Sequence, residues 1–338
     1  MNHLPQFNRR TFLQDAGLIA AVTLVAPFAW GAAASDPKAG KRTPVILATD
    51  IGDDIDDTWA LGFLLKCPEL DLKLVVSDYG KPQYRGKLIA KFLQTVDHGS
   101  VPVGLGPDRE PRGEGGQADW VKDYSLSSYP GRVHPDGVQA MIDTIMGSKE
   151  TVTLIGIGPM PTIAAALARE PRIARRARFV GMDGSVRVGY GGAKTPAPEW
   201  NVKADVKAAQ QVLAAPWEIT ITPLDTCGLV TLDGQRYQRL LKSTDPVVSA
   251  ILQNYRLWCR SNKNQDDAER RSSVLFDTVA IYLAFTQALC QMETLGLRVT
   301  EDGFTRIDDH GKRMAVATAW KDLDGYRDFL VGRLLGEA

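Results

Sequence analysis

Residues 44–65 read PVILATDIGDDIDDTWALGFLL: an apolar run, an acidic loop and a second apolar run. The first run is typical of a buried strand and the second of a buried helix. Five aspartates lie within eight positions between them: Asp50, Asp53, Asp54, Asp56 and Asp57. Capping a helix and complementing its dipole requires one or two acidic residues. Because the remaining carboxylates repel one another, the loop predicts a bound cation.

The nature of the cation follows from the ligand atoms that the loop offers. Ca²⁺ accepts about six to eight oxygen ligands at flexible angles, so clustered carboxylates suit it. No histidine or cysteine lies in the loop, and zinc is therefore not expected.

Strand and helix patterns alternate along the chain after this loop. Expected strands are 44–49, 72–76, 151–157, 177–182 and 217–222, and expected helices are 57–66, 84–96, 135–146, 161–170 and 204–214. Short Val, Ile and Leu runs between helices predict an α/β fold, a three-layer sandwich around a mostly parallel sheet. Ligands bind at the carboxyl ends of such strands, where the aspartate loop is placed.

The remaining segments are less regular. Residues 106–132 are rich in Gly, Pro and Ser and are expected to form a long surface loop. After Asp225 the pattern predicts a mostly helical C-terminal part, with helices at 233–243, 246–259, 277–291 and 320–335.

The composition is that of an ordinary globular protein. The chain has 338 residues, and its 40 Lys and Arg balance its 40 Asp and Glu. No basic excess indicates a nucleic-acid partner. The four cysteines show no CxxC spacing, which excludes a zinc ribbon or thioredoxin motif.

The N-terminus has the features of an export signal. Arg9 and Arg10 precede Phe12 and a moderately apolar stretch, and small residues end near Ala34. This arrangement predicts a twin-arginine signal over 1–34, a periplasmic protein and no membrane contact after export. The alternative is a membrane anchor, but the stretch is shorter than the ~20 residues of a spanning helix. Folding before export favours buried free thiols over disulfides.

The aspartate loop resembles the signature of the inosine-uridine-preferring nucleoside hydrolase family, D-x-D-x-G-x-D-D before an apolar helix. Asp50 and Gly52 match it, and Asp56 and Asp57 match the closing pair if the loop carries two extra residues. Ala48 replaces the first Asp. Three later segments resemble family motifs: VTLIGIGPMPTIAAAL (152–167), PAPEWNVKADVKAA (196–209) and SSVLFDTVAIYLAF (272–285). The resemblance covers nearly all of the expected domain, 43–335.

Members of that family cleave the N-glycosidic bond of ribonucleosides with a water bound to Ca²⁺. The resemblance implies Ca²⁺ here, held by Asp50, Asp57, Asp277 and the carbonyl of Ile157. It implies that Asp50 is also the general base. The implied substrate contacts are Asp56, Glu199, Trp200, Asn201 and Phe276. The implied partner is a small-molecule ribonucleoside or N-riboside, and family members are often dimers or tetramers.

The sequence departs from the family pattern on the side of the leaving base. Phe276 stands where many members have a histidine that serves as the acid. Other conceivable contacts to the base are His134, Tyr190, Tyr255, Trp258 and Arg260. Asp78 or Lys81 stands near a position where the family has an asparagine, and 189–196 lacks a clear match to the asparagine that binds the 5′-hydroxyl. These changes place the substrate in question more than the chemistry.

Three functions fit these residues. The first is calcium-dependent hydrolysis of ribonucleosides or related N-ribosides. The second is a periplasmic riboside-binding protein with little turnover, which the absent acid favours. The third is an aspartate-nucleophile phosphatase, which requires Asp-x-Asp, whereas Ala48 or Gly52 occupies the partner position.

Overall fold

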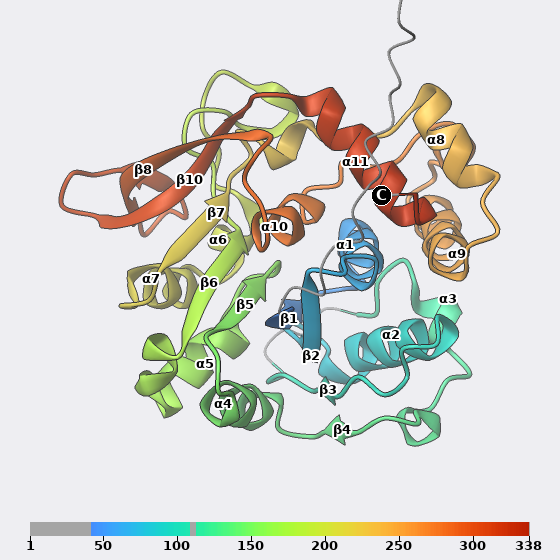
Figure 1. Ribbon diagram of the computed structural model, residues 1–338, viewed down its shortest axis with the longest axis horizontal. Helices are drawn as coiled ribbons and strands as arrows, with labels where there is room; N and C mark the ends of the chain where they lie inside the picture. Colours follow the sequence, from blue (N-terminus) through green and yellow to red (C-terminus); the bar gives the residue numbers. More distant parts are fainter. Residues whose placement is uncertain (1–41, 109–112, 338) are drawn as a thin grey trace, which may run out of the picture. The chain divides into compact units, whose positions relative to one another are not determined.

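A ten-stranded sheet with helices on both faces forms the centre of the computed structural model, which describes residues 42–108 and 113–337 (Figure 1). The strands are β1 Thr43–Thr49, β2 Leu70–Ser77, β3 Val103–Gly104, β4 Val133–His134, β5 Val152–Gly156, β6 Ala177–Met182, β7 Ile219–Thr222, β8 Cys290–Val299, β9 Thr305–Ile307 and β10 Lys312–Trp320. Their order is β4-β3-β2-β1-β5-β6-β7-β10-β8-β9. All pairs are parallel except β10–β8 and β8–β9.

Helices connect the parallel strands and cover the sheet. They are α1 Asp56–Leu65, α2 Pro82–Thr95, α3 Ala118–Val121, α4 Gly137–Gly147, α5 Pro161–Arg169, α6 Trp200–Ala204, α7 Val206–Ala214, α8 Gly234–Leu241, α9 Pro246–Ser261, α10 Thr278–Leu283 and α11 Leu323–Leu335. The five strands and five helices expected between 44 and 222 are confirmed to within two residues at each end.

Strand β1 shows why the sheet is covered on both sides. Val45 and Leu47 pack in a core with α1, α2, α9, α10 and α11, whereas Ile46 and Ala48 pack in a second core with α4, α5 and α7. Successive side chains of a strand point to opposite faces, so a strand that is apolar throughout requires a helical layer on each side. Figure 1 shows α4 and α5 across the sheet from α1.

The expectation of a mostly helical C-terminal part holds only in part, because three strands, β8, β9 and β10, also lie there. The helices at 233–243 and 246–259 are present as α8 and α9, but 277–291 contains only the short helix α10 before β8 begins. Strand β10 ends at Trp320, and the helix expected at 320–335 is present as α11, which begins at Leu323. Strand β8 is partly exposed and contains Gln, Met and Glu, which have good helix propensity. Antiparallel pairing with β10 overrides that local preference.

Three further features bear on the sequence analysis. Residues 106–132 contain the short helix α3 and a 3₁₀ turn, Leu126–Ser128, besides loop. All four cysteines are buried free thiols, as expected. The expected export signal lies outside the described residues, and in the part described no helix has the length and apolar character to cross a bilayer.

Candidate active site

A pocket of about 300 Å³ lies where β1 and β5 end. The strand order runs in opposite directions from these two neighbours, and crevices at such reversal points are the usual ligand sites of parallel sheets. All nine residues singled out from the sequence line this pocket: Asp50, Asp56, Asp57, Ile157, Glu199, Trp200, Asn201, Phe276 and Asp277. Asp53, Asp54, Met182 and Tyr190 complete the lining. The structure thus brings together the nine predicted residues from four separate segments of the chain.

Three buried carboxyl groups form the floor of the pocket. Asp56 and Asp57 occupy the first turn of α1, and Asp277 directly precedes α10. One carboxylate oxygen from each lies within 4.8 Å of the others, and each residue is at most 4 % exposed. Burial and the neighbouring carboxyls raise the pKa of all three well above the usual range. A cluster of this kind is suited to a hard cation, whose charge would compensate all three groups at once.

The membership of this triad differs from the implied ligand set. Asp56, expected at the ribose, belongs to it, whereas Asp50 lies in the pocket but outside the group within 4.8 Å. Thr49 donates a short hydrogen bond to Asp57, which orients that carboxylate from the last position of β1.

Asp50 follows β1 directly and is 5 % exposed. Burial raises the pKa of its carboxyl to about 7, although the nearby Arg85 acts to lower it. Its side chain lies against Gly158, where an added Cβ would come within 2.9 Å of Asp50 Oδ1. Gly158 follows Ile157, so the end of β5 leaves room for the candidate base only because this position has no side chain.

Arg85 holds the acidic loop from behind and was missed in the sequence analysis. It lies on α2, is 2 % exposed, and donates short hydrogen bonds to the carbonyls of Tyr79 and Asp50. It also donates to the Ile51 carbonyl at 3.0 Å and to the Asp53 carboxylate at 2.8 Å. In the sequence, Arg85 stands out only as an arginine among apolar residues of an expected helix. That pattern does not show which groups it binds.

The opposite side of the pocket is formed at the start of α6. Both carboxylate oxygens of Glu199 accept backbone N–H groups, from Gly184 at 2.9 Å, Asn201 at 2.8 Å and Val202 at 3.3 Å. Burial raises the pKa of Glu199 to about 7. Asn201 donates its side-chain amide to the Met182 carbonyl at 2.9 Å, which leaves its Oδ1 as the acceptor for a ligand hydroxyl.

Aromatic side chains form the outer wall. The Tyr190 and Phe276 rings meet edge to face with centroids 6.3 Å apart. The backbone N–H of Trp200 donates to the Tyr190 hydroxyl at 2.8 Å. Tyr190 is 44 % exposed, although partial burial of its hydroxyl raises the pKa above its ordinary value. This wall therefore offers ring surface to a ligand.

The inosine-uridine preferring nucleoside hydrolase family matches residues 45–327, from the first strand to the last helix. The chain belongs to this family. Its fold is that of the nucleoside hydrolases, and the protein is a nucleoside hydrolase. This membership removes the phosphatase alternative.

Individual relatives agree with the family match. This chain is 30 % identical over 228 residues to the non-specific ribonucleoside hydrolase RihC of Klebsiella pneumoniae. The match covers 64 % of this chain and 73 % of that protein. The chain is 28 % identical over 222 residues to the pyrimidine-specific ribonucleoside hydrolase RihA of Salmonella arizonae, covering 62 % and 70 %.

Solved structures share the fold at lower identity. A plant nucleoside hydrolase superposes with a TM-score of 0.73 at 20 % identity, covering 87 % of this chain and 99 % of its own. A purine-preferring ribonucleoside hydrolase from Gardnerella vaginalis gives 0.71 at 20 % identity, with the same coverage.

Several residues considered for the base side of the nucleoside hydrolase pocket do not line it. His134 lies on β4 at the edge of the sheet. Tyr255 donates to the Arg271 carbonyl, Trp258 donates to the Asp53 carbonyl at 3.0 Å, and Arg260 is exposed. Of that group only Tyr190 lines the pocket.

Two further buried acids, Asp78 and Asp183, do not line the pocket. Asp78 accepts the N–H groups of Met160 at 2.7 Å and Thr162 at 2.8 Å, so it fixes the turn into α5 and does not line the pocket. Asp183, which the sequence analysis missed, follows β6 and is fully buried without a hydrogen-bond partner. Burial and the nearby carboxyl groups of Glu199 and Asp78 raise its pKa well above the usual range.

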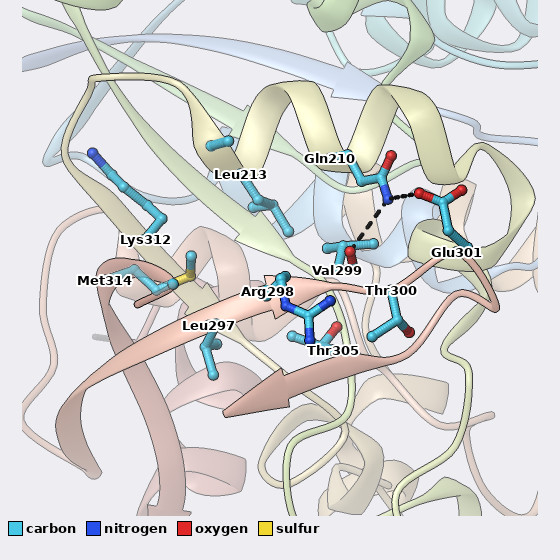
Figure 2. Close-up of a pocket in the computed structure, with 12 residues that line it drawn as sticks. Gln210, Leu213, Leu297, Arg298, Val299, Thr300, Glu301, Thr305, Lys312 and Met314 are labelled. Carbon is cyan, nitrogen blue, oxygen red and sulfur yellow. Dashed lines mark hydrogen bonds between the residues drawn. The ribbon is translucent and has the colours of Figure 1, made fainter. Parts of the chain in front are cut away.

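A second hollow of the nucleoside hydrolase, of about 360 Å³, lies between α7 and the strands β8 and β9 (Figure 2). Gln210 spans it, donating to the Val299 carbonyl at 3.3 Å and to Glu301 at 3.0 Å. Among the described residues that line it, Glu301 is the one acidic side chain, whereas the pocket at the ends of β1 and β5 gathers seven.

Proposed function

We propose that this nucleoside hydrolase cleaves the N-glycosidic bond of ribonucleosides or related N-ribosides in a calcium-dependent reaction that releases ribose and the free base. The observation that carries the proposal is the buried triad of Asp56, Asp57 and Asp277 beside Asp50. The family match and the ribonucleoside hydrolases among its relatives support the same reaction.

The donor set fits Ca²⁺. The pocket lining offers carboxylates and carbonyls, and no histidine or cysteine among the described residues takes part. Asp57, Asp277 and the Ile157 carbonyl would hold the ion together with Asp50, and Asp56 lies close enough to serve as a ligand or to bind a ribose hydroxyl. Bound Ca²⁺ would supply a Lewis acid that lowers the pKa of a coordinated water.

The residues of the chain would perform the remaining tasks. Asp50 would take the proton of the attacking water, since it lies at the triad and its position is set by Gly158 and by Arg85. Asn201 would accept a ribose hydroxyl, and Glu199 would hold the start of α6 that presents it. The carboxylates would stabilise the positive charge that develops on the sugar as the bond breaks.

The cellular site of this reaction is also a proposal. Arg9 and Arg10 before an apolar stretch support export by the twin-arginine route, which would place the folded enzyme in the periplasm. There it would act on ribosides for salvage.

The test is ribose release from a panel of purine and pyrimidine ribonucleosides with Ca²⁺. Asp50→Ala is measured beside the wild type, and Asp123→Asn, an exposed aspartate outside the pocket, is the control. Release that is lost in Asp50→Ala and retained in Asp123→Asn supports the proposal. Binding of ribosides in Ca²⁺ without release from any of them would favour the riboside-binding alternative.

A further inference from the structure

Protonation of the departing base is the step for which the pocket offers the fewest suitable side chains. A neutral base leaves its sugar slowly unless a proton reaches it, and general-acid catalysis is worth about 10²–10⁴-fold. No histidine, lysine, arginine or cysteine lines the pocket among the described residues. The candidates that remain are the carboxyl groups and Tyr190.

Neither Tyr190 nor Glu199 is arranged as a proton donor to a base. The Tyr190 hydroxyl accepts the backbone N–H of Trp200, and its raised pKa makes it a weaker acid than an ordinary tyrosine. Both oxygens of Glu199 are occupied by backbone N–H groups at the start of α6, so neither oxygen is free to reach a base.

The acids at the rim are also engaged. Asp53 pairs with Arg85 at 2.8 Å, and Asp54 accepts the Ile55 N–H at 2.7 Å. The buried triad and Asp50 have their tasks at the cation and the water under the proposed function. Among the described residues, the lining therefore contains no side chain positioned to protonate a base.

The charge of the pocket points to what it can accept instead. Seven carboxyl groups line it, and no basic side chain of the described residues does. Arg85, which pairs with Asp53, and a bound Ca²⁺ would balance only part of this acidic lining. Ring surface from Tyr190, Trp200 and Phe276 forms the outer wall, and aromatic faces attract cations.

We propose that this pocket is built for N-ribosides whose base carries a positive charge, such as N-alkylated purinium or pyridinium ribosides. The inference rests on the proposed hydrolase function and names its substrate class. When the C1′–N bond breaks, its electron pair passes to the ring nitrogen and cancels the positive charge, so the base leaves neutral without a proton. The water oxygen bonds to C1′ and its proton passes to Asp50. The products are ribose, a neutral base and one proton.

Three probes separate the parts of this proposal: guanosine, 7-methylguanosine and 4-nitrophenyl riboside. The base of guanosine needs a proton to depart, and 7-methylguanosine is cationic at mildly acidic pH. The 4-nitrophenyl riboside is neutral, but its leaving group departs as 4-nitrophenolate without a proton. We expect kcat/KM for 7-methylguanosine, relative to the uncatalysed rate, to exceed that for guanosine by about 10²-fold, the lower bound of a missing general acid. We expect its KM to lie about tenfold below that of 4-nitrophenyl riboside and to rise with salt, because the attraction is electrostatic.

Two variants test the residues. Phe276→His supplies a donor, so guanosine cleavage should rise about tenfold and decline above the histidine pKa of about 6.5, while 7-methylguanosine gains nothing. Asp54→Asn removes a rim charge and should raise KM for 7-methylguanosine several-fold more than for 4-nitrophenyl riboside.

The outcomes are distinguishable. If kcat/KM relative to the uncatalysed rate is equal for guanosine and 7-methylguanosine, the inference is overturned and the hydrolase function remains intact. Equal KM for 7-methylguanosine and 4-nitrophenyl riboside would overturn recognition of the cation. No release from any of the three probes would remove the proposed function and this inference with it.

Discussion

Replacing Arg85 tests whether the acidic loop is held from behind. Arg85→Met removes the guanidinium but keeps an unbranched side chain of similar reach on α2. The guanidinium is the donor for the carbonyls of Tyr79, Asp50 and Ile51 and the ion-pair partner of Asp53. Met offers none of these bonds.

The magnitude follows from burial. Arg85 is 2 % exposed, and loss of one partner from a buried charged network costs about 3–5 kcal/mol. The Asp53 side chain is 24 % exposed, so its ion pair with Arg85 contributes little to the free energy of unfolding. Most of the loss comes from the buried carbonyls that are left without a donor, at about 1–3 kcal/mol each before relaxation. We therefore expect the free energy of unfolding to fall by about 3–5 kcal/mol. Arg85→Lys keeps the charge but lacks the planar fork, and should lose about half as much.

Urea unfolding of the metal-free protein at neutral pH measures the effect. The matched control is Arg169→Met, because Arg169 pairs with Asp136 on the surface at 2.7 Å and should contribute about 1 kcal/mol or less. A loss in Arg85→Met no larger than that in Arg169→Met would refute the view that this network holds the loop.

Three further predictions concern the metal, the pH and the sheet end. Ca²⁺ at ~100 times its Kd should raise the free energy of unfolding by about 2.7 kcal/mol, measured as a Tm shift, and Asp277→Asn should abolish that shift. Without Ca²⁺, burial raises the pKa values of Asp50 and Glu199 in the folded protein to about 7, so the native state binds more protons than the unfolded state. The free energy of unfolding should therefore fall as the pH rises from ~4 through ~7. A flat profile of urea midpoints between pH 5 and pH 8 would contradict this. Gly158→Ala should lower kcat/KM by ~10²-fold by displacing Asp50, whereas Gly147→Ala, where an added Cβ meets nothing within 4 Å, should leave activity unchanged.

Much of the site could be predicted because its residues follow strand ends. Asp50 comes directly after β1 and Ile157 directly after β5, and parallel strands bring their carboxyl ends to one edge of the sheet. Apolar runs of strand length are visible in a sequence, so the placement of these residues in one pocket was predictable. The motifs at Glu199 and Asp277 then supplied residues from further along the chain.

The errors arose where local pattern and long-range contact disagree. The pattern after Asp225 predicted mostly helix, whereas β8 pairs with β10 and β9 and forms a strand. Phe276 and Tyr190 were considered separately for the base, and only the folded chain places their rings 6.3 Å apart on one wall.

By itself, the sequence determined the acidic loop after the first strand, the parallel core and the family, because each depends on spacing within a short segment. Only the tertiary structure decided which carboxyls share the triad and what stabilises them from behind. Arg85 reaches the carbonyl of Asp50 across 35 positions of the chain, and Asp277 meets Asp56 from the far end of the domain. The physical reason is burial: the free energy of a charge depends on which groups surround it once water is excluded, and those groups are brought together only by the completed fold.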